Sequence, residues 1–137
     1  MIKLINPFNK QELILDSKKK IYIDNNNNKF PIINNIPRFV TNKNYALNFG
    51  FQWNNFRETQ IDNGDFNLST IRFFAETNKK KEYFDNKKIL EVGSGAGRFS
   101  NVILNSTNAE LYSVDLSSAV EAKKKNNIQF LNKKFYI

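Results

Sequence analysis

The chain has 137 residues, and a domain of this size buries roughly two-thirds of the surface that its unfolded form exposes. Its residues are 40% hydrophobic and 14% aromatic, which excludes a disordered or fibrous chain. The sequence contains neither cysteine nor histidine, so disulfides, thiol chemistry, zinc sites with the usual ligands and imidazole general bases are excluded.

The formal net charge of +8 would suit a polyanionic partner, because a basic surface attracts phosphate groups and anionic lipids over long distances. The lysines, however, come in short runs at 18–20, 79–81 and 123–125, beside turn-forming residues or at the end of a predicted helix. Such runs are typical of a solvated surface. Charge alone therefore indicates solubility, and nucleic acid is the less favoured partner.

No stretch of the sequence reaches the roughly 18–20 apolar residues that are needed to cross a bilayer. The start, MIKLINPFNK, has too short an apolar run before Pro7 for a secretory signal. We therefore expect a cytoplasmic protein with no membrane partner.

Residues 1–40 alternate short strand-like runs with turn-forming residues. The runs lie at 2–5, 13–15, 20–23 and 30–33, and the turn-formers include Asn6-Pro7 and the asparagine tract at 25–28. This alternation predicts a small antiparallel β module.

Residues 41–86 predict a mostly helical connector. Apolar residues recur at helical spacing in YALNFGFQWNNF (45–56) and in LSTIRFFAETN (68–78), and the polar turn IDNGDFN (61–67) separates the two runs. Ser69 or Thr70 is the expected N-cap of the second helix.

From residue 87 onward, short apolar runs alternate with helical patterns. The predicted strands are KKILEV (87–92), ELYSVD (110–115) and IQFL (128–131), and the predicted helices are GRFSNVILN (97–105) and SSAVEAKKKN (117–126). The first helix places Phe99, Val102 and Ile103 on one face, and Ser117 or Ser118 caps the second. This β-α-β-α-β order predicts a parallel sheet with right-handed crossovers.

The turn after the first of these strands, in LEVGSGAGR (90–98), has glycine at alternate positions: Gly93, Gly95 and Gly97. Ligands of an open α/β sheet bind at the carboxyl ends of its strands. A glycine there permits positive φ and removes the Cβ that would hold a ligand away from the backbone amides. Asp115 ends the next strand about 20 residues later, where a carboxylate can accept both hydroxyls of a ribose. The pattern predicts a nucleoside site rather than only a tight turn.

The glycine pattern differs from that of a dinucleotide fold, which needs G-x-G-x-x-G. Counted from Gly93, the third glycine position is Arg98. The sequence instead reads E-x-G-x-G-x-G, with Glu91 two residues before the turn. A carboxylate there would repel a pyrophosphate but could orient a cation or an amino group, so the pattern favours a positively charged nucleoside.

ILEVGSGAGRFS followed by LYSVDLSSAVEAKKKN resembles the first two motifs of the class I S-adenosylmethionine-dependent methyltransferases of the type 11 and 12 groups, over residues 87 to about 127. The resemblance implies an α/β protein with the N-terminal part of a Rossmann-like methyltransferase fold, and S-adenosylmethionine as its cofactor. The implied cofactor-binding residues are Glu91, Gly93, Ser94, Gly95, Gly97, Asp115 and Leu116.

By this resemblance the glycines would line the methionine part of the cofactor, and Glu91 would help to hold the loop and the amino group. Asp115 would bind the ribose hydroxyls, with Leu116 beside the adenine. The residues at 87–137 would thus form a cofactor-binding half-domain.

The connector is similar to the segment that precedes this motif in one subgroup of the family, where helices cap the cofactor cleft. This similarity makes four side chains candidate lid residues: Tyr45, Phe49, Trp53 and Arg72. Packing of these side chains in the core of a helix face is the alternative that we favour.

Residues 1–40 resemble the small zinc-ribbon-like module that often precedes such methyltransferases. In that module two Cys-x-x-Cys pairs bind the metal, whereas here the first pair falls on Asn6 and Asn9 and the second near Ile23 and Asn26. We therefore expect no metal and a module that depends on a small apolar core, although units of this size usually need a further staple.

Family members continue after the second helix with a strand and an acidic residue, and then with the remaining strands and the catalytic elements. Here the corresponding sequence is IQFLNKKFYI. We therefore expect a truncated methyltransferase with half of the cofactor pocket, whose catalytic residues and methyl acceptor the sequence does not identify.

Two alternatives remain open. A three-stranded parallel sheet would expose an edge and an apolar face, which favours a non-catalytic half-domain that pairs with a second polypeptide. The net charge of +8 and the aromatic residues also fit a basic nucleic-acid-binding module.

Overall fold

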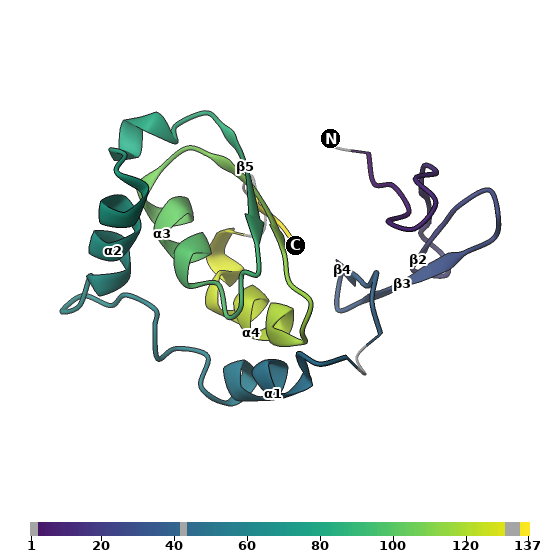
Figure 1. Ribbon diagram of the computed structural model, residues 1–137, viewed down its shortest axis with the longest axis horizontal. Helices are drawn as coiled ribbons and strands as arrows, with labels where there is room; N and C mark the ends of the chain where they lie inside the picture. Colours follow the sequence, from purple (N-terminus) through teal and green to yellow (C-terminus); the bar gives the residue numbers. More distant parts are fainter. Residues whose placement is uncertain (1–2, 42–43, 131–134) are drawn as a thin grey trace. The chain divides into compact units, whose positions relative to one another are not determined.

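A computed structural model describes residues 3–41, 44–130 and 135–137 of the chain. The chain divides into two compact units, Met1–Thr41 and Asn42–Ile137 (Figure 1). The first unit ends one residue after the predicted module boundary at residue 40. Residues 42–86, which we predicted to be a connector, belong to the same compact unit as the parallel sheet.

The first unit is an antiparallel sheet with the strand order β1-β2-β3-β4, which confirms the predicted β module. Its strands are β1 (Ile14–Asp16), β2 (Ile21–Ile23), β3 (Lys29–Ile33) and β4 (Ile36–Pro37). Leu13, Phe30 and Ile36 form its small buried core. The predicted run at 2–5 begins outside the described residues, and Ile5 makes an isolated bridge to Glu12.

A buried carboxylate, Asp24, joins separate turns of the first unit. Its Oδ2 accepts hydrogen bonds from the side-chain amides of Asn6 (2.7 Å), Asn9 (2.8 Å) and Asn28 (2.8 Å). Its Oδ1 accepts from the backbone N–H groups of Asn26 (2.9 Å) and Asn28 (2.8 Å). Hydrogen bonds to a charged acceptor are stronger than neutral ones. Asp24 therefore supplies a polar staple in addition to the small apolar core that the sequence predicts.

The asparagines at the first expected metal-ligand pair are oriented by their neighbours. Asn6 Oδ1 accepts a hydrogen bond from the backbone N–H of Phe8 (2.9 Å), and Asn9 Oδ1 accepts one from Gln11 (3.0 Å). Each amide therefore turns its NH2 group, not its oxygen, toward Asp24. Within the described part of the chain, no group of three or more His, Cys, Asp or Glu residues is placed to hold a metal ion.

The second unit contains a parallel sheet with the strand order β5-β6-β7. β5 (Lys88–Val92) pairs in register with β6 (Glu110–Val114), and Leu111 and Tyr112 of β6 pair with β7 (Phe135–Tyr136). The helices are α1 (Leu47–Asn55), α2 (Leu68–Thr77), α3 (Arg98–Ser106) and α4 (Ala119–Asn126), with short 3₁₀ helices η1 (Lys81–Tyr83) and η2 (Ile128–Phe130). A mixed α/β chain with separate antiparallel and parallel sheets is thus what the structure shows.

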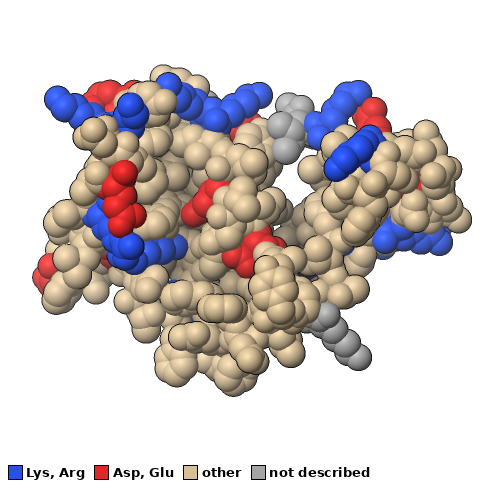
Figure 2. Space-filling view, viewed as in Figure 1, with Lys and Arg blue, Asp and Glu red and all other residues tan. Residues whose placement is uncertain are grey.

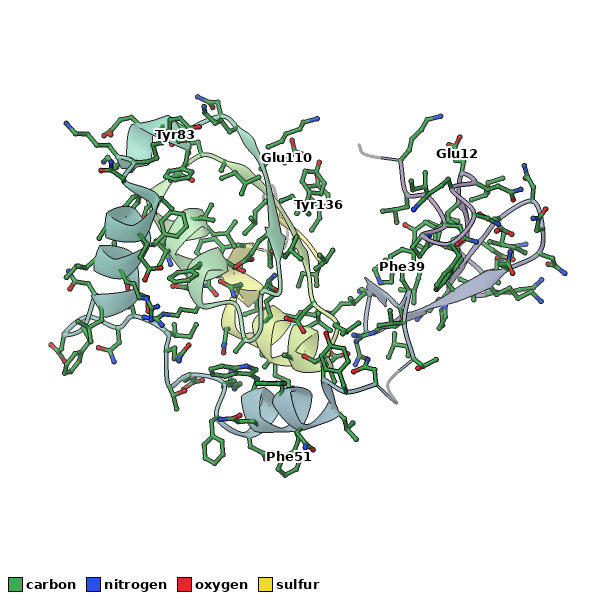
Figure 3. The ribbon with its side chains drawn as sticks, viewed as in Figure 1. Glu12, Phe39, Phe51, Tyr83, Glu110 and Tyr136 are labelled. Carbon is green, nitrogen blue, oxygen red and sulfur yellow. The ribbon has the colours of Figure 1, made fainter. Side chains whose placement is uncertain are left out.

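Successive side chains along each strand point to opposite faces of this sheet, and one face is covered while the other is open. The covered face belongs to the core, whose buried residues are Ile103, Ala109, Leu111, Phe130 and Phe135. On the other face Leu90 is 66% exposed and Val92 is 74% exposed. Figure 3 shows Glu110 and Tyr136 close together at this sheet, where the ring of Tyr136 stacks on Tyr112 with a centroid distance of 4.8 Å. Parallel sheets are normally covered on both faces, so the open face is a distinctive feature of this unit.

Aromatic rings join α2 to α3. The ring centroid of Phe73 lies 5.6 Å from that of Phe99 and 5.2 Å from that of Phe84. Phe99 is half-buried while Val102 and Ile103 are buried, so the predicted inward face of α3 is confirmed.

The predicted third strand at 128–131 is wrong. Ile128–Phe130 form η2, Leu131 lies outside the described residues, and the third strand is β7. The N–H of Phe130 donates to the carbonyl of Asn127 (3.0 Å), and this turn places the Phe130 side chain in the core. An apolar run of four residues does not distinguish a strand from one helical turn.

The predicted cap of α2 is also wrong. The helix begins at Leu68, and the first-turn N–H groups of Ser69 and Thr70 both donate to the carboxylate of Asp62 (2.8 Å each). A carboxylate satisfies these free donors and interacts favourably with the helix dipole. For α4, the N-cap residue is Ser118, but the hydroxyl of Ser117 accepts from the N–H of Ala119 (3.2 Å).

None of the helices in the described residues is long and apolar enough to span a bilayer. Figure 2 shows a row of lysine and arginine side chains along the upper edge of the second unit. The ammonium groups of Lys79 and Lys87 lie 4.9 and 3.9 Å from the ring centroid of Tyr83 at this edge.

The hydrogen bonds of Asp24 predict that acid destabilises the first unit. Burial opposes ionisation, but the side-chain hydrogen bonds from Asn28, Asn9 and Asn6 outweigh it and hold the pKa of the Asp24 carboxyl below its ordinary value. A carboxyl whose pKa is lower in the folded state stabilises the fold fully above its unfolded pKa of 3.8. We expect this stabilisation to be lost as the pH falls below that value.

Asp24→Asn removes the charge at every pH, so we expect faster amide hydrogen exchange in the four strands at neutral pH and a melting temperature lower by on the order of 10 °C. Two-dimensional NMR of the full chain measures the exchange rates. Asp16→Asn is the control, because the Asp16 carboxylate contacts only the exposed Lys19 in the described hydrogen bonds and ion pairs. Equal acid sensitivity of the wild type and Asp24→Asn would contradict the assigned role.

Candidate ligand site at the glycine loop

The loop that joins β5 to α3 has a left-handed backbone at each of its glycines. The φ angles are 71° at Gly93, 51° at Gly95 and 84° at Gly97. Residues with a side chain rarely adopt this conformation. No atom lies within 4 Å of the position that a Cβ of Gly93 would occupy, so this glycine borders open space.

The other two glycines are needed for close packing as well. A Cβ on Gly97 would lie 2.6 Å from Nδ2 of Asn127 and 2.7 Å from Cγ of Lys123, so this glycine packs against α4. A Cβ on Gly95 would lie 3.4 Å from Nε1 of Trp53. The loop is therefore enclosed by α4 on one side and by a side chain of α1 on the other.

A hollow of about 210 Å³ lies at the carboxyl ends of β5 and β6. Its lining residues are Ala46, Phe49, Trp53, Gly93, Gly95, Asp115 and Ser117. Sites for small organic ligands typically measure roughly 300–1,000 Å³. In this conformation the hollow therefore admits part of a nucleoside-sized ligand, and Trp53 limits its extent over Gly95.

The helix that covers the hollow is held by a close contact at Gly50, which sequence reasoning missed. A Cβ there would lie 2.3 Å from Oγ of Ser118 and 2.9 Å from its backbone nitrogen. The side-chain amide of Asn54 also donates to the Ser118 carbonyl (3.0 Å). These contacts seat α1 on the start of α4, which places Phe49 and Trp53 at the hollow.

Asp115 connects the glycine loop to the turn after β6. Its Oδ2 accepts the backbone N–H of Gly95 (2.7 Å), and its Oδ1 accepts both the N–H (2.8 Å) and the hydroxyl (2.6 Å) of Ser117. A carboxylate offers about four lone-pair sites. One site remains for a ligand hydroxyl, and a second ligand hydroxyl would compete with that of Ser117.

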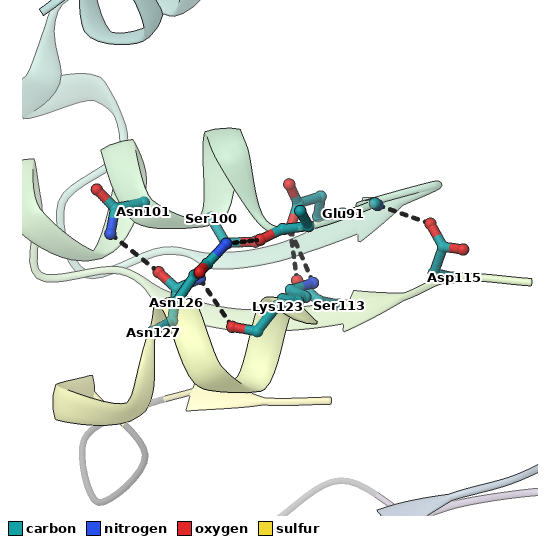
Figure 4. Close-up of polar contacts among 10 residues, drawn as sticks. Glu91, Ser100, Asn101, Ser113, Asp115, Lys123, Asn126 and Asn127 are labelled. Atoms are coloured by element: carbon teal, nitrogen blue, oxygen red, sulfur yellow. Dashed lines mark hydrogen bonds and ion pairs between the residues drawn. The ribbon is translucent and has the colours of Figure 1, made fainter. Parts of the chain in front are cut away.

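Glu91 lies behind the loop, where one oxygen joins three other elements (Figure 4). Its Oε2 accepts hydrogen bonds from the hydroxyls of Ser100 in α3 (2.5 Å) and Ser113 in β6 (2.5 Å). The same oxygen lies 3.2 Å from Nζ of Lys123 in α4. Glu91 therefore holds β5, β6, α3 and α4 together, and it does not line the hollow.

The prediction that lysines 123–125 form a solvated run is wrong for Lys123, whose side chain is fully buried. The buried positions of α4 form one inward stripe: Ala119, Val120, Ala122, Lys123 and Asn126. Burial lowers the pKa of Lys123 to about 8, against the opposing attraction of Glu91 and Asp115.

Two asparagines at the end of α4 also brace the loop, and sequence reasoning missed them. The side-chain amide of Asn126 donates to the carbonyls of Ala96 (2.9 Å) and Arg57 (2.6 Å). Asn127 accepts from the side chain of Asn101 (3.2 Å) and donates to the carbonyl of Lys123 (3.1 Å). The sequence could have indicated them only by their position, three or four residues after the buried positions Ala122 and Lys123 of α4.

The remaining predicted residues lie in different surroundings. The hydroxyl of Ser94 is buried and has no hydrogen-bond partner among the described residues. Leu116 does not line the hollow, and its carbonyl accepts from the side chain of Asn44 (2.9 Å). Of the candidate lid residues, Phe49 and Trp53 line the hollow, Tyr45 is 86% exposed, and Arg72 pairs with Glu76 along α2 (2.7 Å).

No protein-family model matches the sequence, and the search of curated proteins returned no match. Inferences about this site therefore depend on its own residues and their geometry.

The packing of Gly97 predicts that Gly97→Ala destabilises the second unit by about 2–4 kcal/mol, because the methyl group clashes with α4 and the backbone is left-handed. Urea unfolding followed by the emission of Trp53 measures this loss. Gly64→Ala is the matched control, since no atom lies within 4 Å of a Cβ at Gly64. Equal stability of the two variants would show that α4 does not pack against the loop in this way.

Proposed function

We propose that the second unit is the cofactor-binding part of an S-adenosylmethionine-dependent methyltransferase, with a Rossmann-like sheet whose glycine loop borders the cofactor. The observation that supports this proposal most directly is the meeting of Gly93, Gly95 and Asp115 at one hollow. These residues come from the ends of two adjacent parallel strands, which is where open α/β sheets bind ligands. The cytoplasmic location expected from the sequence is part of this proposal.

The residues at the hollow fit such a ligand. Gly93 leaves open space where a side chain would stand, and the buried hydroxyl of Ser94 has no partner among the described residues. Asp115 retains acceptor capacity for a ribose hydroxyl. The rings of Phe49 and Trp53 give the apolar wall that most small-molecule sites have.

The proposal changes the role of Glu91. The resemblance implied that this carboxylate helps to hold the amino group of the cofactor, but its Oε2 is engaged by Ser100, Ser113 and Lys123 behind the loop. We assign Glu91 to the support of the loop, which is the other part of its implied role. The amino-acid end of the ligand would then contact the exposed backbone of the loop.

S-adenosylmethionine supplies an activated methyl group when it is bound. The contribution of this chain would be to hold the nucleoside at Asp115 and to exclude water with Phe49 and Trp53. Methyl transfer depends mainly on holding the acceptor in line with the methyl group, and none of the described residues is assigned as a base.

Calorimetric titration with S-adenosylhomocysteine tests the proposal. We expect saturable binding by the wild type, and binding weaker by on the order of 10- to 100-fold in Asp115→Ala, because a hydrogen bond to a charged acceptor is lost. Asp115→Asn, which keeps one acceptor oxygen, should lose less.

The control variant is Asp65→Asn, an exposed carboxylate in the turn before α2, and the control ligand is NAD. Asp65→Asn should bind as the wild type does, and NAD should give no heat of binding. A folded wild-type chain that gives no response to S-adenosylhomocysteine would contradict the proposal.

The open face of the parallel sheet favours a second candidate function, a non-catalytic half-domain that pairs with another polypeptide. Leu90, Val92 and Val114 are 66%, 74% and 48% exposed on adjacent strands. The sheet has two strands of five residues and one strand of two. Its face therefore covers at most roughly 190 Å², whereas a standard interface buries about 800 Å² on each partner. A partner would therefore need to pair with the edge of β5 as well as cover this face.

Exposure of this face predicts that Leu90→Lys together with Val92→Lys lowers the fluorescence of the dye ANS and reduces self-association at high concentration. The free energy of unfolding should change by only about 0.5 kcal/mol, because both side chains are exposed. Sedimentation velocity and dye titration measure the two effects. Ile14→Lys, which removes a 60% exposed apolar side chain from the first unit, is the control. Unchanged dye binding in the double variant would show that this face is covered.

A further inference from the structure

Lys123 is the buried ionisable group that the proposed function leaves unused. We propose that Lys123 is a positioning residue of the glycine loop: its ammonium, paired with Glu91, holds the loop in the conformation that accepts a ligand. The choice of S-adenosylhomocysteine as the test ligand rests on the proposed function. The effect of Lys123 on the loop itself does not depend on it.

The side chain of Lys123 contacts the loop and the sheet at the same time. Its Cγ lies 2.7 Å from the position of a Cβ on Gly97, so the aliphatic stem packs directly on the loop. Its Nζ lies 3.2 Å from Oε2 of Glu91 in β5. Because the ammonium fixes the end of the stem, loss of the ion pair frees the part of the side chain that supports Gly97.

Glu91 extends this effect to both sides of the hollow. Ser100, which donates to Glu91, lies in the first turn of α3 directly after the loop. Ser113, the other donor, lies two residues before Asp115 in the chain. Without the ammonium, a half-buried carboxylate would retain only these two hydroxyl partners among the described contacts, which is unfavourable.

The charged groups that the described elements bring toward Lys123 are few. Glu91 of β5 and Asp115 after β6 both favour the protonated form. Ser100 and Ser113 contribute hydroxyls, and β7 presents the ring of Phe135, whose centroid lies 5.7 Å from the ammonium. Since burial lowers the pKa of Lys123 to about 8, the proton is bound at neutral pH and lost a little above it.

The pH dependence of stability and the pH dependence of ligand binding distinguish a positioning role of Lys123 from a purely structural one. The pKa of Lys123 is lower in the folded chain than its ordinary value of 10.5, so the unfolded chain binds more protons between about pH 8 and 10.5. The contribution of Lys123 to global stability therefore rises with pH across this window. If Lys123 positions the loop, ligand binding should instead weaken as the pH rises through about 8.

The emission of Trp53 tests the loop without any ligand. Trp53 is the only tryptophan of the chain, and its Nε1 lies 3.4 Å from the position of a Cβ on Gly95. We expect the wild type to show a transition centred near pH 8 and Lys123→Met to show none. Lys125→Met, which changes an exposed neighbour in the same helix, should keep the wild-type transition.

The second measurement is the affinity for S-adenosylhomocysteine between about pH 7 and pH 9. We expect the wild type and Lys125→Met to lose about tenfold in affinity across this range, and Lys123→Met to bind weakly at every pH. If Lys123→Met does not fold, the variant Lys123→Met with Glu91→Gln removes both charges and takes its place.

Different results would overturn the role of Lys123 and the proposed function. A pH-independent Trp53 signal in the wild type, or a Lys123→Met variant that keeps both the affinity and the pH profile of the wild type, overturns the role of Lys123. If no variant binds S-adenosylhomocysteine, the proposed function fails, and the Trp53 titration alone decides whether Lys123 positions the loop.

Discussion

The second unit depends on a single carboxylate oxygen, Oε2 of Glu91, at which four elements meet. Two hydroxyls and the ammonium of Lys123 converge on it from α3, β6 and α4. Removing one partner of a buried ion pair costs far more than the pair contributes, because the other charge stays buried without compensation. The position of the glycine loop is therefore linked to the packing of helices that do not line the hollow.

The first unit also depends on a buried carboxylate that accepts hydrogen bonds from separate segments of the chain. Asp24 accepts hydrogen bonds from the side chains of Asn6 and Asn9, where the zinc-ribbon resemblance places the first pair of metal ligands, and from the side chain of Asn28. A metal ion draws in electron-rich ligands, whereas a carboxylate draws in donors, so the amides of Asn6 and Asn9 turn their NH2 groups inward. In this unit the buried charge at the turn after β2 is negative, and its asparagine neighbours are oriented as donors to match it.

Most of the fold could be predicted from local patterns. The strands at β5 and β6 and the helices at α1, α2, α3 and α4 follow the spacing of apolar residues, and the glycine loop follows the alternation of three glycines. The errors have physical reasons. The run IQFL is too short to distinguish a strand from a helical turn. Asp62 caps α2 from seven residues before Ser69, which is farther away than the position of an ordinary N-cap residue. The burial of Lys123 was missed because lysine is rarely buried unless it is paired, and its partner Glu91 lies 32 residues away.

The candidate site was less predictable than the fold because its carboxylates also make contacts that hold the protein together. Asp115 was expected to await a ligand, yet it already accepts from Gly95 and Ser117. The same carboxylate that could bind a hydroxyl thus holds the loop closed against β6 before a ligand arrives. A ligand hydroxyl at the remaining acceptor site of Asp115 would add a hydrogen bond, whereas one that replaces the Ser117 hydroxyl would exchange one hydrogen bond for another of similar strength. Further affinity would come from burying the apolar surface of the ligand against Phe49 and Trp53. Selectivity at this hollow would then depend on the shape of the aromatic wall, and the wall is positioned by the contact of Gly50 with Ser118.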